Sequence, residues 1–257
     1  MRTGRPLLVG TIALAMLGTL PLSGLAEDTA GDAVDAARQA RDASSVRAPA
    51  PSLGCGRSDV EAGISRGQPL VIDGQEREWS MVVPPAHDGM NPVPLWVQLH
   101  GNQGADLTAV ALIALAAETH GFVGVGPTGH HGNPSWLWHK EDDDVDLTQA
   151  NPDIAFVEAL VDHLGEMLCL DLARVYAVGE NQGGYGVTGL ACALEDRLAA
   201  VATVSGMFDL GERCELERPV PLLAVHGRND TYALFDGDSG DHPAGLPLRG
   251  DGEPMLY

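Results

Sequence analysis

The sequence has few basic residues. Its 257 residues include 15 lysines and arginines against 36 aspartates and glutamates, which gives a formal net charge of −21. A surface this acidic repels nucleic acid and anionic membranes, so we expect neither as a partner. Two interpretations of the acidity stay open: a solvated acidic surface, or a site that binds cations.

Long apolar runs are scarce, and the one that occurs lies at the start of the chain. It spans Leu7–Leu20, follows two arginines and precedes a few small residues. This order is typical of a secretory signal peptide, and the run is too short to predict a membrane span. We therefore predict a signal peptide over residues 1–26 and export to the periplasm or the extracellular space.

Large apolar residues are almost absent from the next stretch, residues 27–53, which is rich in Ala, Asp, Arg, Ser and Pro. Such a segment cannot bury enough surface to offset its chain entropy, which predicts a disordered leader. The folded domain is then expected over residues 54–257.

Cysteine is scarce as well, and the spacing of the four residues does not resemble a zinc site. They are Cys55, Cys169, Cys192 and Cys214. Export permits disulfides, and four cysteines allow three pairings. We expect two bridges, with buried free thiols as the alternative.

Short apolar strands alternate with helical segments through the domain. Strands are expected at 95–99, 122–125, 175–178, 200–204 and 220–225, helices at 107–119, 151–168 and after Gly184, and a hairpin around Asp73-Gly74. This alternation predicts an α/β fold whose sheet is mostly parallel and has helices on both faces. No strand or helix is evident from Asp236 onward, so the last strand and helix are expected to be missing.

The stretch Gly179-Glu180-Asn181-Gln182-Gly183 joins a buried strand to a helix. Its two glycines and its position match a nucleophile elbow, G-x-S-x-G, but the central residue is Asn181. An amide is a poor nucleophile because its nitrogen lone pair is delocalised. Asparagine tolerates positive φ better than most residues, so we predict that the turn persists while its chemistry is lost.

Backbone donors for an oxyanion are expected at two corners. One is the N–H of Asn102, just after the corner His100-Gly101 that ends the strand 95–99. The other is the N–H of Gln182, the residue after the nucleophile position. The two corners together indicate an oxyanion site more specifically than either corner does alone.

Three further groups follow strand ends. Asp230 comes five residues after the strand that ends at Val225 and suits the acid of a catalytic triad, with a surface aspartate as the alternative. Trp136 and Trp138 are candidates to line a substrate pocket, with ordinary loop packing as the alternative. The acids between Glu141 and Asp153 could hold a hard cation, but their spacing matches no EF-hand and favours a solvated loop.

Several runs, taken together, carry a family resemblance: Leu99–Gly101, Cys169–Gly179, Leu190–Cys192, Asp196–Ala202 and Arg218–Gly227. They resemble the secreted polyhydroxybutyrate depolymerase and feruloyl esterase-like group of α/β-hydrolases. The resemblance implies the α/β-hydrolase fold and an extracellular carboxylic-ester hydrolase that uses a Ser-Asp-His triad, needs no cofactor and takes a polyester or an aryl or acyl ester. It also implies the disulfide Cys169–Cys192, which by elimination leaves Cys55 to pair with Cys214.

The sequence departs from this family twice. Asn181 occupies the nucleophile position, and the triad histidine, which the family places after a further strand, is missing. His242 is the only histidine after Asp230. These departures predict an esterase scaffold that is catalytically impaired. The alternatives are a non-catalytic extracellular binding protein for polyester or phenolic-ester ligands, and a hydrolase in which Asn181, converted to aspartate, is the nucleophile.

Overall fold

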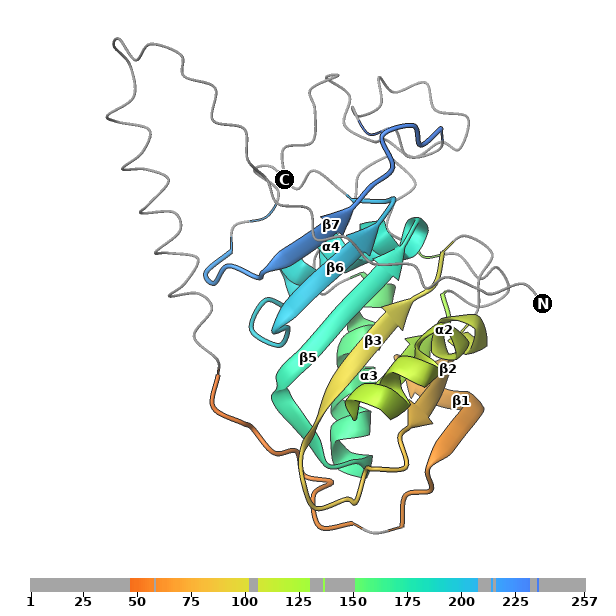
Figure 1. The fold of residues 1–257 in the computed structure, drawn as a ribbon, viewed down its shortest axis with the longest axis vertical. Coiled ribbons are helices and arrows are strands. Elements are labelled where there is room, and N and C mark those ends of the chain that lie inside the picture. Colours follow the sequence, from red (N-terminus) through yellow and green to blue (C-terminus); the bar gives the residue numbers. More distant parts are fainter. Residues whose placement is uncertain are drawn as a thin grey trace, which may run out of the picture. The chain divides into compact units, whose positions relative to one another are not determined.

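The computed structural model describes residues 47–57, 59–101, 106–129, 136, 151–207, 214, 216–231 and 235. Within this part of the chain, seven strands form one sheet in the order β1-β2-β4-β3-β5-β6-β7 (Figure 1). The strands are β1 (Gly63–Ile72), β2 (Gln75–Val83), β3 (Val93–Leu99), β4 (Val123–Pro127), β5 (Leu170–Glu180), β6 (Ala200–Val204) and β7 (Leu222–Val225).

Most of the sheet is parallel. Strands β4, β3, β5, β6 and β7 run parallel to their neighbours, whereas the β1–β2 hairpin is antiparallel within itself and to β4. The hairpin turns at Asp73 and Gly74, whose φ angles are 50° and 76°. Two successive positive φ angles suit the right-handed twist of a tight hairpin, which explains the Asp-Gly pair.

Helices cover both faces of the sheet (Figure 1). Helix α2 (Asp106–His120) lies on one face, and α3 (Pro152–Met167) and α4 (Gln182–Ala193) lie on the other. Side chains along β3 point alternately to the two faces of the sheet. Leu95 and Val97 join the core beneath α3 and α4, while Trp96 packs with the cluster beneath α2. The predicted fold class is thereby confirmed.

Helix α3 begins as its sequence predicts. The Asn151 side chain accepts hydrogen bonds from the backbone N–H groups of Asp153 and Ile154, and Pro152 occupies the first turn. An asparagine cap satisfies amides that have no partner within the helix, and a proline there loses no hydrogen bond.

The end of the predicted leader lies against the domain. Ser52 is buried, and its hydroxyl donates to the carbonyl of Leu168 at 2.5 Å and accepts from the N–H of Leu170 at 2.9 Å. Pro51 forms an isolated antiparallel bridge with Asp171. This short segment therefore contributes hydrogen bonds to the start of β5, although its composition suggested a solvated chain.

The disulfides differ from the predicted pairs: the structure joins Cys55 to Cys169 and Cys192 to Cys214. Cys169 immediately precedes β5, which extends roughly 35 Å toward the elbow, whereas α4 returns only about 18 Å along it. Cys192, near the end of α4, therefore does not reach the level of Cys169. The segment around Ser52 instead brings Cys55 to Cys169, with 4.0 Å between their Cα atoms.

Several predictions concern residues outside the described ranges: the signal peptide 1–26, most of the leader, Asn102, Trp138, most of the acidic loop and His242. Among the residues that are described, no helix is both long and apolar enough to span a bilayer. The same residues contain no cluster of histidine, cysteine and carboxylate side chains suited to a metal ion.

Candidate functional site

The turn between β5 and α4 is the centre of the candidate site. Strand β5 ends at Glu180 and α4 begins at Gln182, so Asn181 alone makes the corner. Its φ and ψ angles are 51° and −119°, which confirms the predicted positive φ. The Asn181 N–H donates to the carbonyl of Val204 at 2.9 Å, and its carbonyl accepts from the N–H of Tyr185 at 3.2 Å.

The glycines around the elbow are required by close backbone contacts. A Cβ atom on Gly179 would lie 2.2 Å from the carbonyl oxygen of Gly183, and one on Gly183 would lie 2.5 Å from that of Leu99. On the next strand end, a Cβ atom on Gly206 would lie 2.2 Å from the carbonyl oxygen of Asn181. These contacts are far below van der Waals separation, so the glycine pattern preserves the corner whichever residue stands at its tip.

The two predicted oxyanion corners are neighbours. A Cβ atom built on Gly101 would lie 3.4 Å from the Cβ atom of Asn181, which places the end of β3 beside the elbow. Gln182 is the first residue of α4, where helix geometry leaves backbone amides at the positive end of the dipole. Asn102 lies outside the described residues, so the two-donor arrangement stays a prediction.

His100 fixes the corner after β3. Its Nε2 accepts a hydrogen bond from the N–H of Gly129 at 3.0 Å, and its Nδ1 lies 2.8 Å from the carbonyl oxygen of Gly101. An Nε2 that accepts carries no proton, so the ring is the neutral tautomer with its proton on Nδ1, which donates to Gly101. His100 is 3% exposed and joins two strand ends.

Trp136 packs against this histidine. Its indole N–H donates to the carbonyl of His100 at 2.9 Å, the two ring centroids are 4.7 Å apart, and the tryptophan is buried. The structure thus places Trp136 within the core, where it packs against His100 and stabilises the turn after β3. Its contact with a substrate stays a prediction.

Asp230 lies in the turn after β7, as the sequence predicts. Its N–H donates to the carbonyl of Gly227 at 3.0 Å, and its Oδ2 lies 3.8 Å from Nε2 of His226, an ion-pair distance only when the imidazole is protonated. The side chains of His226 and Asp230 are 3% and 17% exposed. The sequence predicts a partner histidine after Asp230, whereas the histidine that lies near Asp230 in the structure is His226, four residues before it in the sequence.

Strand register brings these groups to one edge of the sheet. Glu180, Val204 and Val225 are paired across β5, β6 and β7, so the residues that follow them lie side by side. Those residues are Asn181, Ser205 and His226, and two strand spacings of about 4.8 Å place His226 on the order of 10 Å from the elbow. The nucleophile position and the His226–Asp230 pair therefore share the carboxyl edge, where α/β sheets bind their ligands.

Comparisons with known proteins agree with this geometry. No protein-family model matches the sequence. A probable feruloyl esterase C of Aspergillus niger is 28% identical over 197 residues, which cover 73% of this chain and 65% of the relative. The putative esterase NocK of Nocardia uniformis subsp. tsuyamanensis is 27% identical over 216 residues, or 77% of this chain and 58% of the relative. The chain thus spans less than two thirds of either relative.

Solved structures show the same fold. A thermostable esterase superposes with a TM-score of 0.53 at 20% identity, over 65% of this chain and 48% of that one. The native form of sOPH superposes with a TM-score of 0.55 at 18% identity, over 77% and 76% of the two chains. The resemblance predicted from the sequence is confirmed by these findings. The chain therefore has the α/β-hydrolase fold, and the curated proteins that its sequence resembles are feruloyl esterases and a putative esterase.

Proposed function

We propose that this protein is an exported esterase scaffold that has lost the serine mechanism and holds an ester ligand at the carboxyl edge of its sheet. The observation that supports the proposal best is the backbone of Asn181, which keeps the strained elbow conformation at φ 51° with an amide in place of the nucleophilic hydroxyl. The two disulfides are compatible with an oxidising compartment and hence with export.

The chemical argument rests on what an amide lacks. An asparagine side chain has no hydroxyl to deprotonate and no available lone pair on nitrogen, so no acyl-enzyme can form at Asn181. Removal of the serine in a well-studied serine protease costs on the order of 10⁶-fold in turnover. What remains is stabilisation by backbone donors and substrate binding, roughly 10³- to 10⁴-fold over water in the same enzyme.

The test measures binding and turnover on the same ligand. Calorimetry with ethyl ferulate and with hydroxybutyrate oligomers should show saturable binding, while chromatography of the same samples should show only slow release of the free acid. Saturable binding with only slow release is the result that the proposal predicts, and it would also support the second candidate function, a non-catalytic binding protein for phenolic or polyester ligands. Rapid release of acid would overturn the proposal.

The triad histidine is the second proposed loss, and Asn181→Ser separates it from the first. Because general-base catalysis contributes about 10²- to 10⁴-fold, a restored serine without a positioned base should stay slow. Fast turnover by Asn181→Ser would show that a base is in place and that only the nucleophile is lost.

Deamidation offers the remaining route to activity. Conversion of Asn181 to aspartate would supply a carboxylate nucleophile. Mass spectrometry of the elbow peptide should show an unmodified asparagine, and a mass increase of about 1 Da that parallels esterase activity would contradict the proposed inactivity.

A further inference from the structure

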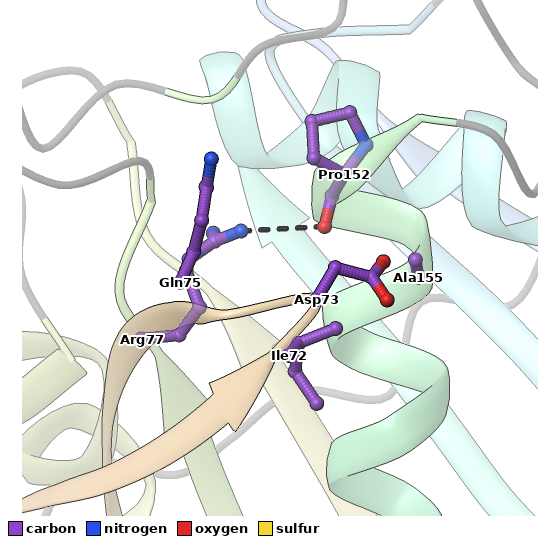
Figure 2. Close-up of a pocket in the computed structure, with 6 residues that line it drawn as sticks. All are labelled: Ile72, Asp73, Gln75, Arg77, Pro152 and Ala155. Carbon is purple, nitrogen blue, oxygen red and sulfur yellow. Dashed lines mark hydrogen bonds between the residues drawn. The ribbon is translucent and has the colours of Figure 1, made fainter.

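A second hollow lies away from the elbow, between the β1–β2 hairpin and the start of α3 (Figure 2). Its volume is about 100 Å³. Six residues line it: Ile72, Asp73, Gln75, Arg77, Pro152 and Ala155. Neither the fold nor the proposed esterase site accounts for this pocket.

Arg77 forms its wall and is buried with a 3% exposed side chain. Its guanidinium donates to Asp153 Oδ1 at 2.5 Å and to the carbonyls of Pro152 and Thr128, each at 3.2 Å, and it lies 4.3 Å from the ring centroid of Phe156. Its Nε is buried and has no hydrogen-bond partner. A buried guanidinium N–H without an acceptor is costly, and Arg77 lines the pocket, so a ligand oxygen that reaches this N–H from the pocket would be stabilised there.

The charges of the pocket select the class of ligand. Asp153 neutralises Arg77, and Asp73 adds a carboxylate to the residues that line the pocket (Figure 2). An anion would be repelled by Asp73 and by a chain whose net charge is −21. An ammonium group would leave the Arg77 N–H unsatisfied. A neutral hydroxyl group satisfies both residues, because it can accept a hydrogen bond from Arg77 and donate one to Asp73.

We infer that this pocket binds vicinal hydroxyl groups of a small polyol or of a sugar ring. One hydroxyl accepts from the Arg77 Nε–H and another donates to the Asp73 carboxylate, while Ile72, Pro152 and Ala155 contact the carbon skeleton. The inference goes beyond the proposed esterase scaffold and does not depend on it.

The pocket lies on the same edge of the sheet as the elbow. Strand β2 is antiparallel to β4, with Trp79 opposite Pro127, so the first residues of β2 sit at the carboxyl end of β4. The sheet order places β4 and β3 between β2 and β5. Three strand spacings of about 4.8 Å put the pocket on the order of 15 Å from Asn181 along this edge. A ligand that carries both an ester and hydroxyl groups could therefore contact both sites.

Ligand-observed saturation-transfer NMR on the full chain tests the inference, with glycerol and D-xylose as the probes and 1-propanol and acetate as controls. We expect saturation transfer to glycerol, to D-xylose or to both, and none to the controls. Transfer to glycerol alone assigns the site to free polyols, and transfer to D-xylose alone assigns it to a sugar ring. No transfer to either probe would overturn the inference and would leave an ordered water as the partner of Arg77.

Three variants locate the signal. Ala155→Leu fills the pocket and should abolish it. Asp73→Asn keeps a residue that tolerates the turn conformation but removes the charged acceptor, and should weaken binding about tenfold. Glu76→Gln is the matched control, because it removes one charge from the same hairpin on the opposite side of the strand. Unchanged binding by Ala155→Leu and Asp73→Asn would contradict the assignment, and Asp73→Asn decides the matter if Ala155→Leu fails to fold.

Discussion

Asn181 separates two requirements that a serine at the elbow meets together. The backbone must accept φ 51°, and the side chain must supply a nucleophile. Asparagine meets the first and fails the second, because its short polar side chain tolerates the left-handed region while its amide is inert. At the scale of the residue, the elbow therefore has the backbone shape of a nucleophile elbow without its chemistry, and the glycines around it are evidence for that shape alone.

Gly183→Ala tests the steric requirement. The new Cβ would lie 2.5 Å from the carbonyl oxygen of Leu99, so we expect a loss of about 3 kcal/mol or failure to fold. Gly165→Ala in α3 is the control, because its Cβ would find ordinary contacts at 3.6 Å from Ser52. Helix propensity predicts a gain of about 0.5–1 kcal/mol for the control. Equal effects of the two variants in urea unfolding would refute the close-contact argument.

Asp171 predicts how stability depends on pH. Burial acts to raise the pKa of its carboxyl, but hydrogen bonds from the Ala50 N–H, the Arg174 guanidinium and the Ala173 N–H outweigh it and hold the pKa below the ordinary 3.8. The unfolded chain therefore takes up the proton first as the pH falls. The stabilisation is complete above pH 3.8 and is lost as the pH drops through the lower, folded pKa.

Asp171→Asn should lower the free energy of unfolding at pH 7 by about 1.5–3 kcal/mol and flatten its fall below pH 4. The measurement is a set of urea titrations across the acidic range. Glu118→Gln, at an exposed position of α2, is the control and should leave the profile unchanged. A profile for Asp171→Asn that matches the parent would contradict this role.

At the scale of the element, the sequence predicts a turn or a helix start correctly where a few neighbouring residues determine it. The Asp73-Gly74 turn and the Asn151 cap each follow from a few neighbouring residues, and both appear as predicted. The carboxyl-edge location of Asn181 and Asp230 also follows from the order of strands. Register and helix return length decide which distant residues meet, so the Cys55–Cys169 pair could not be read from spacing. The His226–Asp230 pair is separated by only four residues, so the sequence did offer a signal for it.

The disulfides give a prediction at this scale. Peptide mapping without reductant should recover Cys55 with Cys169 and Cys192 with Cys214. Replacing Cys55 and Cys169 together by serine should cost about 2–5 kcal/mol, and more than the same change at the other pair, because the first bridge closes a loop of 114 residues and the second one of 22. Recovery of a Cys169–Cys192 peptide would show that the observed pairing is wrong.

At the scale of the molecule, the far edge of the sheet is exposed. In the described part of the chain β7 pairs only with β6, and Leu222, Leu223 and Val225 are 46%, 63% and 53% exposed. An apolar strand edge invites pairing with another copy. Leu223→Lys should therefore reduce concentration-dependent light scattering, whereas Leu115→Lys, at an exposed position of α2, should change it less. If both variants reduced light scattering equally, the exposed β7 edge would not be the cause of the association.

The central claim is that Asn181 cannot act as a nucleophile on an esterase scaffold. The most direct measurement is the initial rate of p-nitrophenyl butyrate hydrolysis by the purified protein beside Asn181→Gly, which tolerates the elbow φ of 51° and has no side chain. We predict the same slow rate for both proteins, because neither has a nucleophile at the elbow. A parent rate far above buffer that falls to the buffer rate in Asn181→Gly would contradict the account.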